Sequence, residues 1–420
     1  SPAKMWIGGL QRLRKPLLHL NTQYGRDIPW ESIDMEYMNL HQSAHGDREF
    51  AYILARMRLP HKTVAGFWQE ERTRRRMGNW MRAAVGVAES RRLRVLRISD
   101  NMRQVAVTDG DKVEAQMVFG WQVDHYGVGD IVRATEAVTE TEIDAQMADY
   151  AAHYDLDTDR LEAVRYQARE EVALRRFLEW GGFGAFHTNF QDLQGLRQLP
   201  GLAVQDLMRQ GYGFAGEGDW KTAALCRIMK RMTADRSGGT AFMEDYTYHF
   251  DPANPLELGA HMLEVCPSLA CERPCIRVEE LGIGDREAPA RLVFRAKAGP
   301  AVLATLVDMG DRFRMIVNDV DCVEQERDMP RLPVAGVLWK PRPSLETAAE
   351  AWMTAGGAHH SVLSYALTAE ELEDLAELLD TVEADEEIRV LVITGAGEKA
   401  FVAGADIGEM STLTKAEGEA

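Results

Sequence analysis

Apolar and polar positions in the first hundred residues switch repeatedly between helical and strand spacing. The spacing predicts helices over 5–13, 47–57 and 70–89, and strands over 16–20, 62–68 and 91–98. Strands that alternate with helices along a chain are typical of a parallel α/β domain. Such a domain normally opens with a strand, whereas this sequence opens with a helix, so we expect the first domain to be incomplete.

The next stretch continues as a mixture of strands and helices. Weak alternation predicts strands over 105–118 and 130–138, and apolar residues at helical spacing predict a strong helix over 158–180. The pair Gly181-Gly182 ends that helix. A further helix is predicted over 219–232, so this stretch forms a second α/β domain.

After residue 239 the pattern changes to strands with few helices between them. The strands are predicted over 240–250, 258–265, 290–296 and 312–317. The fold class expected from the whole pattern is therefore α/β: two Rossmann-like α/β domains, the first incomplete, precede a β-rich, barrel-like domain that is also incomplete. The expected bounds of these three domains are 1–93, 94–238 and 239–363.

The distribution of charge marks a further boundary. The chain of 420 residues has a formal net charge of −18, and residues 361–420 alone hold 15 Asp and Glu against 3 Lys and Arg, a net charge of −12. This segment also has no Trp, His or Cys, and a composition break of that size indicates a separate unit. The overall negative charge argues against nucleic acid and anionic membranes as partners. The sequence has no run of 18 apolar residues that would predict a membrane span.

The cysteines and the first residues bear on the setting of the protein. Five cysteines are an odd number, which suits reduced thiols better than a disulfide framework, so we expect a cytoplasmic protein. The chain opens with Ser1-Pro2-Ala3, without an initiator Met and without a charged and apolar leader. We therefore expect a fragment or a processed product.

Two carboxylates stand out by their surroundings. Glu217 lies between two glycines, which allow a sharp turn that brings its carboxylate into a cleft; the alternative is an acidic residue favoured near a helix N-terminus. Strand alternation places Glu244 on one face with Phe242 and the aromatic residues that follow, where a buried carboxylate needs a partner or a metal. If that face is exposed to solvent, Glu244 has no such role.

Two histidine positions complete a candidate set of metal ligands. His261 alternates with apolar residues, which is more typical of a core histidine than of a ligand, and the pair His359-His360 follows a glycine loop. Two Glu with one or two His form a mixed oxygen and nitrogen set suited to Mn²⁺ or a similar divalent ion. Their spacings match no compact metal motif, so the pattern alone leaves the site open.

These residues lie in sequence blocks that resemble the L-arabinose isomerase family. The resemblance is nearly continuous from residue 1 to about 363 and is carried by Ala44–Phe50, Asp100–Arg103, Leu199–Gln205, Gly211–Ala223, Phe242–Phe250, His261–Pro267 and Ala355–His360. It implies reversible isomerisation of L-arabinose to L-ribulose through an enediol, with one Mn²⁺ per subunit, a small sugar as substrate and a homo-oligomer. A fucose-type isomerase is the nearest rival. The family has a further segment before the block that opens at Ser1, so we expect that N-terminal segment to be missing.

The resemblance also implies roles for seven residues, carried over by position. Glu217, Glu244, His261 and His360 would bind the metal. Glu217 and Glu244 would in addition form the acid/base pair that moves a proton between C2 and C1 of the sugar. His45, Met102 and Phe190 would help to line the sugar pocket.

The last segment resembles a different family, that of enoyl-CoA hydratase (crotonase). Thr368-Ala-Glu-Glu371 is a capping box before a helix, 388–394 predicts a strand, and Lys399–Ile407 resembles that family's oxyanion loop. The resemblance implies a crotonase-like α-β fragment over 364–420, in which the N–H of Ala405 faces a thioester oxyanion. We expect a join near 364–367, made by recombination or assembly. The alternatives to a truncated, impaired isomerase are therefore CoA-thioester binding by this segment and an inactive chimera.

Overall fold

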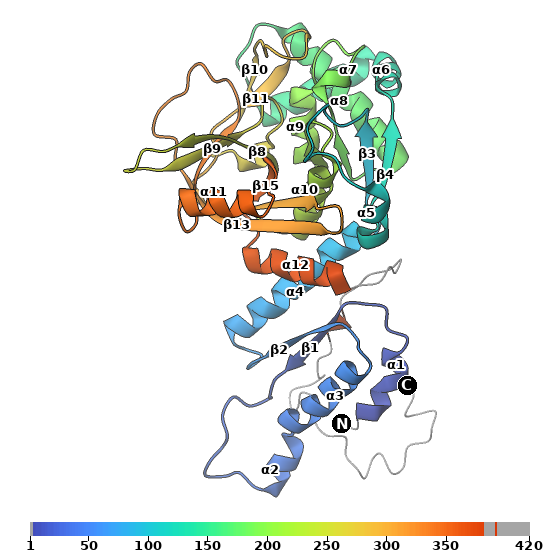
Figure 1. Cartoon of the computed structure of the whole chain (residues 1–420), viewed down its shortest axis with the longest axis vertical. Helices are drawn as coiled ribbons and strands as arrows, with labels where there is room; N and C mark the ends of the chain where they lie inside the picture. The colour runs from blue at the N-terminus through green and yellow to red at the C-terminus, as the bar shows by residue number, and fades with distance from the viewer. Residues whose placement is uncertain (1–2, 382–390, 393–420) are drawn as a thin grey trace. The chain divides into compact units, whose positions relative to one another are not determined.

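The structure, a computed structural model, describes residues 3–381 and 391–392. The chain forms two compact units: unit 1 consists of Ser1–Ala88 with Glu373–Ala420, and unit 2 consists of Glu89–Leu372 (Figure 1). Among the helices of the described residues, none combines the length and the hydropathy that a membrane span requires.

Unit 1 is built around a small sheet whose strand order is β16-β1-β2. Its elements are η1 (Ala3–Trp6), α1 (Ile7–Leu10), β1 (Leu17–Asn21), α2 (Met35–Leu40), α3 (Ser43–Arg56), β2 (His61–Ala65), most of α4 (Glu71–Ser90) and β16 (Leu391–Val392). β1 and β2 are parallel, as the alternation of strands and helices predicts. Leu10, Leu17 and Leu54 form a core between α1, β1 and α3, so this unit buries apolar surface of its own.

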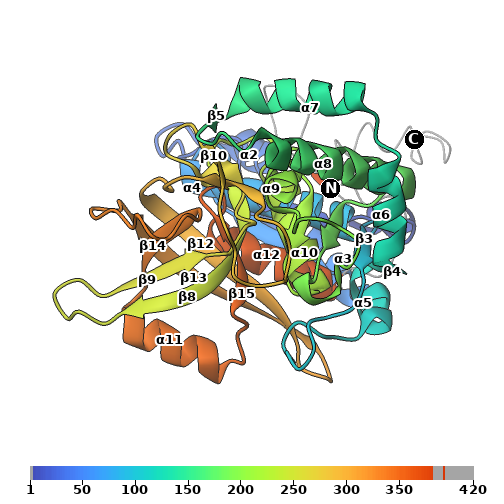
Figure 2. The same cartoon turned by 90° about the horizontal axis from the view of Figure 1, so that it is seen from above.

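Unit 2 begins with a four-stranded parallel sheet of order β4-β3-β6-β7. The strands are β3 (Arg94–Ile98), β4 (Gln122–Tyr126), β6 (Ala185–His187) and β7 (Gly213–Ala215), and the helices are α5 (Lys112–Phe119), α6 (Val128–Glu136), α7 (Glu140–His153), α8 (Leu161–Gly181), η2 (Phe190–Asp192), α9 (Gly201–Arg209) and α10 (Trp220–Met232). Figure 2 shows α8 in a layer between α7 and α9. α8 ends at Gly182 in the left-handed conformation, so the predicted helix and its stop are confirmed.

Two predicted strands in this region are wrong. Residues 105–118 form a loop followed by α5, and residues 130–138 lie mainly in α6. Asp111 caps α5 because its carboxylate accepts hydrogen bonds from the N–H groups of Val113 and Glu114. α6 buries Ile131 and Thr135, one helical turn apart. A capping residue and buried residues at helical spacing therefore determine the structure of these segments, rather than the weak alternation of apolar and polar residues.

The remainder of unit 2 contains a closed barrel of order β12-β13-β14-β9-β8-β15. These strands are β8 (Thr240–His249), β9 (Leu256–Ala260), β12 (Gly299–Asp308), β13 (Phe313–Val323), β14 (Gly336–Pro341) and β15 (His360–Ser364). Around them lie β5 (Asp155–Leu156), η3 (Pro267–Leu269), β10 (Cys275–Val278), β11 (Ala290–Val293), α11 (Leu345–Thr354) and α12 (Ala369–Thr381), whose last residues belong to unit 1. The predicted mixed α/β fold and barrel-like domain are confirmed. The Rossmann-like character, the incompleteness of the domains and their bounds stay predictions.

The contact between β7 and α10 gives a test of this packing. A Cβ at Gly213 would lie 2.2 Å from the carbonyl oxygen of Ala223 and 2.6 Å from the nitrogen of Arg227, both backbone atoms of α10. Because the helix backbone cannot yield locally, we expect Gly213→Ala to lower the free energy of unfolding by about 3 kcal/mol. Gly129→Ala in α6 meets only a flexible side-chain atom at 3.7 Å and is the matched control. Urea titration measures both, and equal losses would contradict the packing argument.

Candidate active site

Three loops converge at the carboxyl ends of β3, β6 and β7. In the loop after β3, the N–H of Met102 donates to the carbonyl oxygen of Glu217, which lies after β7, at 2.9 Å. The N–H of Gly218 donates to the carbonyl oxygen of Thr188, after β6, at 3.1 Å. This edge is where open parallel sheets bind ligands, so Glu217 stands at a favourable place.

The backbone at Glu217 makes the sharp turn expected from its flanking glycines. Glu217 has φ of 57° and Gly218 has φ of 87°, both in the left-handed region. A Cβ at Gly216 would lie 2.8 Å from Cε1 of His261, and a Cβ at Gly218 would lie 2.4 Å from Cα of Asn101. A left-handed non-glycine residue is strained, and such strain concentrates at functional sites.

The barrel brings the other candidate ligands to the same place through strand register. β8 and β15 are antiparallel neighbours in which Glu244 lies opposite His360. On the other side of β8, Glu244 lies opposite Ala260, the last residue of β9, and His261 follows directly. Nε2 of His261 is 3.6 Å from Oε2 of Glu244, and Nε2 of His360 is 3.9 Å from Oε2 of Glu217.

Two overlapping groups of potential metal ligands result in the described part of the chain. One group is Glu217, His359 and His360, and the other is Glu244, His261 and His360; within each, one ligand atom per residue lies within 4.8 Å of the others. His360 belongs to both groups. The sequence-predicted set of Glu217, Glu244, His261 and His360 is therefore brought together, and its metal-binding role remains a prediction.

The two histidines are oriented by carboxylates on their far sides. Nδ1 of His360 is 3.1 Å from Oδ2 of Asp219, and Nδ1 of His261 is hydrogen-bonded to Glu264. The side chain of His360 is fully buried, and its Nε2 has no hydrogen-bond partner among the described residues. A buried nitrogen without a partner costs about 1–3 kcal/mol, and histidine held by a carboxylate at one nitrogen is typical of metal sites. The donor set therefore fits a divalent cation.

The electrostatics of the cluster separate the two glutamates. Burial acts to raise the pKa of Glu217, but the nearby rings of His359 and His360 outweigh it and hold that pKa below its ordinary value. Burial raises the pKa of Glu244, and His261 only partly offsets it. Burial acts to lower the pKa of His261, but the Glu264 carboxylate outweighs it and raises the pKa to about 9.

The three residues expected to line the sugar pocket are placed differently. Met102 is attached through its backbone to Glu217, as described above. Phe190 begins η2 directly after Asn189, whose side-chain amide donates to the carbonyl oxygen of Asp100 at 3.0 Å, so Met102 and Phe190 lie on adjoining loops. His45 lies in α3, in unit 1. Their contact with a sugar stays a prediction, and Ala405 lies outside the described residues.

Sequence reasoning missed the roles of two residues of this cluster, Asp219 and Glu264, and left the role of a third, His359, open. Asp219 was expected only to open α10, and it does accept a hydrogen bond from the N–H of Thr222, but its other oxygen faces His360. Glu264 follows His261 by three residues, a spacing that could have suggested a partner. His359 was noted as a neighbour of His360, yet its Nε2 lies 3.2 Å from Oε2 of Glu217.

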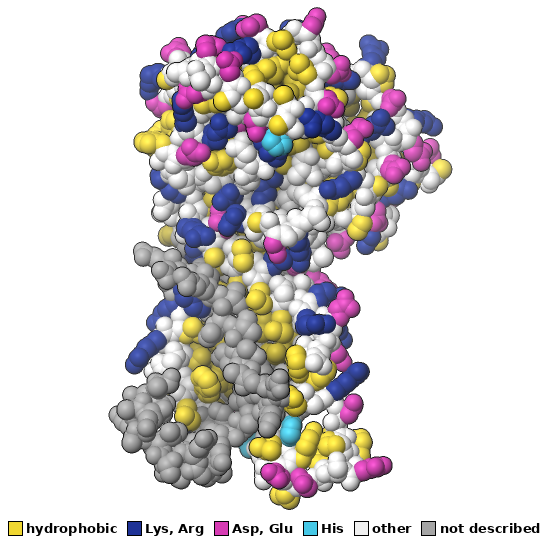
Figure 3. Space-filling model, turned by 180° about the vertical axis from the view of Figure 1, so that it is seen from behind, with side chains coloured by type: hydrophobic (Ala, Val, Ile, Leu, Met, Phe, Trp, Pro, Cys, Tyr) yellow, Lys and Arg dark blue, Asp and Glu magenta, His cyan; other side chains and the backbone are white. Residues whose placement is uncertain are grey.

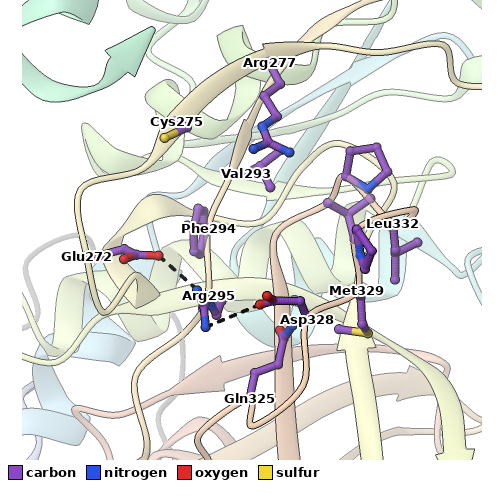
Figure 4. Close-up of a pocket in the computed structure, with 14 residues that line it drawn as sticks. Glu272, Cys275, Arg277, Val293, Phe294, Arg295, Gln325, Asp328, Met329 and Leu332 are labelled. Carbon is purple, nitrogen blue, oxygen red and sulfur yellow. Dashed lines mark ion pairs between the residues drawn. The ribbon is translucent and has the colours of Figure 1, made fainter. Parts of the chain in front are cut away.

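A separate pocket of about 380 Å³ is lined by β10, β11 and the segment before β14 (Figure 4). Arg295 lies in its wall with two acidic neighbours, Glu272 at 3.9 Å and Asp328 at 3.8 Å. Phe294 and Met329 give it an apolar lining. The four candidate ligands do not line this pocket, so it is distinct from the cluster.

Comparison with known proteins identifies the family. The N-terminal, central and C-terminal domains of L-arabinose isomerase match residues 1–92, 94–235 and 239–382. The L-arabinose isomerase of Anoxybacillus flavithermus is 59% identical over 385 residues, which cover 90% of this chain and 77% of that protein. The chain belongs to the L-arabinose isomerase family. Family members from Geobacillus stearothermophilus and Bacillus subtilis are 58% and 56% identical over the same shares of both chains.

The family match corrects one expectation. Residues 1–92 match the N-terminal domain of L-arabinose isomerase, so the prediction that the family's N-terminal segment is missing is wrong. Much of this region folds as the sheet and core of unit 1. The opening helix suggested a missing beginning because a strand usually leads such a domain, and here β1 follows η1 and α1.

The resemblance of the last segment to a second family is also supported. Residues 363–419 match the enoyl-CoA hydratase/isomerase family, and this match overlaps the L-arabinose isomerase match over 363–382. In the overlap the predicted capping box of α12 is confirmed, because the N–H of Thr368 donates to Glu371 at 3.0 Å and the N–H of Glu371 donates to Oγ1 of Thr368 at 3.4 Å. Most of the predicted strand over 388–394 lies outside the described residues, and β16 occupies its centre.

The raised pKa of His261 predicts proton release on cation binding. With a pKa of about 9, His261 is protonated at pH 7, whereas a ligating imidazole must be neutral. As a ligand of a divalent cation such as Mn²⁺, His261 would release a proton on binding at pH 7, and the affinity would rise as pH increases toward 9. Calorimetry in buffers of different ionisation enthalpy measures this release. Glu264→Gln removes the carboxylate that raises the pKa, so release should fall; equal release by both proteins would contradict the assignment.

Proposed function

We propose that this chain interconverts L-arabinose and L-ribulose at the cluster formed by Glu217, Glu244, His261 and His360, which bind one divalent cation such as Mn²⁺. The observation that supports the proposal most directly is Nε2 of His360, which is buried beside a carboxylate and has no hydrogen-bond partner among the described residues. The similar proteins are named L-arabinose isomerases, which favours this sugar over a fucose-type substrate.

The proposed reaction requires two proton movements. One proton leaves C2 of the aldose and is returned to C1, and one leaves the hydroxyl at C2 while the carbonyl oxygen at C1 gains one. Two carboxylates beside the sugar can carry both. Glu217, whose pKa is lowered, is ionised at neutral pH and accepts the C2 proton, and Glu244 serves as the second proton carrier. The cation, when bound, polarises the sugar oxygens as a Lewis acid.

The surroundings of the two histidines are apolar on one side. The ring of Phe242 lies edge-on to His261 and His360, with centroid distances of 4.9 and 5.0 Å. Phe242 is fully buried, so both imidazoles pack against an apolar ring, which forms an apolar floor beneath them. An apolar floor keeps the ligating rings fixed and strengthens electrostatic interactions at the carboxylates.

The match of residues 363–419 favours a second candidate function. This segment would bind a CoA thioester, with the N–H of Ala405 toward the oxyanion. A join of the two families near 364–367, natural or artificial, underlies that candidate and also the alternative of an inactive chimera. A ketose assay with and without Mn²⁺, run beside a measurement of acyl-CoA binding, separates the three possibilities. Ketose formation supports the isomerase, and acyl-CoA binding without ketose formation supports the second candidate. The absence of both supports the inactive chimera.

We also propose that the protein acts in the cytoplasm as a homo-oligomer. All five cysteines are free, which suits a reducing compartment.

A surface for self-association is the arm, defined as residues 24–40, which includes α2. The helix α2 has no buried residue, and Trp30 is 78% and Met35 66% exposed. Figure 3 shows hydrophobic and acidic side chains together in the region of unit 1 that contains the arm. Over unit 2, charges of both signs are interspersed. Clustered exposed apolar residues mark interaction sites.

Removal of either carboxylate tests the catalytic proposal. We expect Glu217→Gln and Glu244→Gln each to lower ketose formation from L-arabinose by about 10²–10⁴-fold, because each loses a group that carries protons. Glu324→Gln, outside the cluster, is the matched control and should retain activity. Colorimetric ketose assays with added Mn²⁺ measure the three variants. Full activity of either cluster variant would exclude its proposed role.

The arm gives a separate test of self-association. Because Trp30→Glu with Met35→Glu places charge on the proposed contact, we expect a smaller assembly than the wild type at equal concentration. Trp180 is 70% exposed in α8 of unit 2, so Trp180→Glu is the control and should leave the assembly intact. Light scattering after size-exclusion chromatography gives the masses. An unchanged mass for the arm variant would remove the arm from the interface.

A further inference from the structure

Lys221 is completely buried although it carries a charged side chain. It is the second residue of α10 and follows Asp219 by two positions. Buried lysines are rare because an ammonium group is costly to take out of water unless it is paired. Its three donor positions face three acceptors: the carbonyl oxygen of Val107 at 3.1 Å, that of Asp109 at 2.5 Å, and Oδ1 of Asp219 at 3.5 Å.

On one side, Lys221 neutralises the carboxylate that holds His360. Asp219 has a side chain only 1% exposed, and its Oδ2 accepts a hydrogen bond from Oγ1 of Thr222 at 2.7 Å and lies 3.1 Å from Nδ1 of His360. Removing one partner of a buried ion pair leaves the other charge uncompensated. Lys221 therefore compensates the charge of the carboxylate that contacts His360.

On the other side, Lys221 fixes the loop that follows β3. Its two carbonyl acceptors, Val107 and Asp109, lie near the end of this loop. The start of the same loop is tied to the site, because the N–H of Met102 donates to Glu217. The side-chain amide of Asn101 connects the two ends of this loop to the turn at Glu217. It donates to the carbonyl oxygen of Thr108 at 2.5 Å and to that of Gly218 at 3.1 Å.

We propose that Lys221 is a positioning residue that couples the cation cluster to the loop expected to line the sugar pocket. This inference rests on the proposed function. One buried ammonium group orders Asp219, and with it His360, and orders residues 101–109 at the same time.

The experiment compares two lysines of the same helix. Lys230 in α10 also donates to backbone, to the carbonyl oxygen of Thr240 at 2.6 Å, but its second hydrogen-bond partner is the Cys266 thiol at 3.3 Å rather than a carboxylate. We expect Lys221→Met to weaken Mn²⁺ binding by about 10–100-fold, the usual range for residues that orient metal ligands. Lys230→Met should keep wild-type affinity. Competition with a chromophoric chelator measures affinity well below the unfolding temperature of each variant.

Two further readouts separate positioning from stability. Amide hydrogen exchange over residues 101–109 should be faster in Lys221→Met than in Lys230→Met. The loss of Mn²⁺ affinity in Lys221→Met should largely vanish when Asp219→Asn is already present, because the lysine acts through that carboxylate. Lys221→Arg keeps the charge and should recover part of the Mn²⁺ affinity. If Lys221→Met does not fold, Lys221→Arg replaces it in the comparison with Lys230→Met.

The outcomes distinguish the two levels of inference. A wild-type protein that binds no Mn²⁺ and forms no ketose overturns the proposed function and this inference with it. A wild-type protein that binds Mn²⁺, with equal affinity and exchange in Lys221→Met, overturns the positioning role alone. Equal losses in the two lysine variants, or fully additive losses with Asp219→Asn, also overturn it.

Discussion

The hydrogen bond between Asp219 and His360 joins the two halves of unit 2 at the site. Asp219 belongs to the N-terminus of α10, which follows the parallel sheet, whereas His360 opens β15 of the barrel. Both side chains are almost fully buried, so the bond forms where water cannot compete for either partner. The imidazole held in this way presents its second nitrogen toward Glu217, 3.9 Å from Oε2 of that residue.

Strand register does the remaining assembly. Glu244 lies opposite His360 on one neighbour of β8 and opposite Ala260 on the other, so a slip of one residue would turn Glu244 to the other face of the sheet. A bulge between Asp245 and Thr247 then changes the alternation of β8. Tyr246 lies within this bulge and Tyr248 lies beyond it, and the two residues are 44% and 41% exposed. The site thus lies in the regular part of the strand, just before its pattern breaks.

Much of this arrangement could be predicted from the sequence, for identifiable reasons. Long periodic segments such as α8 and the glycine-flanked turn at Glu217 carry local signals that the structure confirms. Contacts made across the fold carry no such signal: the pairing of Asp219 with His360 joins residues 141 positions apart. Weak alternation also misled, because the Asp111 cap decided the structure of α5. The resemblance to a family, rather than spacing, brought the four candidate ligands together.

The short strand β16 has a consequence for the sheet of unit 1. It pairs in parallel with β1, Leu17 opposite Leu391 and Leu18 opposite Val392, and so covers the first two residues of the edge of β1 that β2 leaves free. These residues belong to the segment that resembles enoyl-CoA hydratase, whereas β1 belongs to the part that matches L-arabinose isomerase. A strand from the segment that resembles enoyl-CoA hydratase thus adds to a sheet of the part that matches L-arabinose isomerase, as in β-strand addition. Without β16, the main-chain groups at this edge of β1, an apolar strand, would be open to pairing with another molecule.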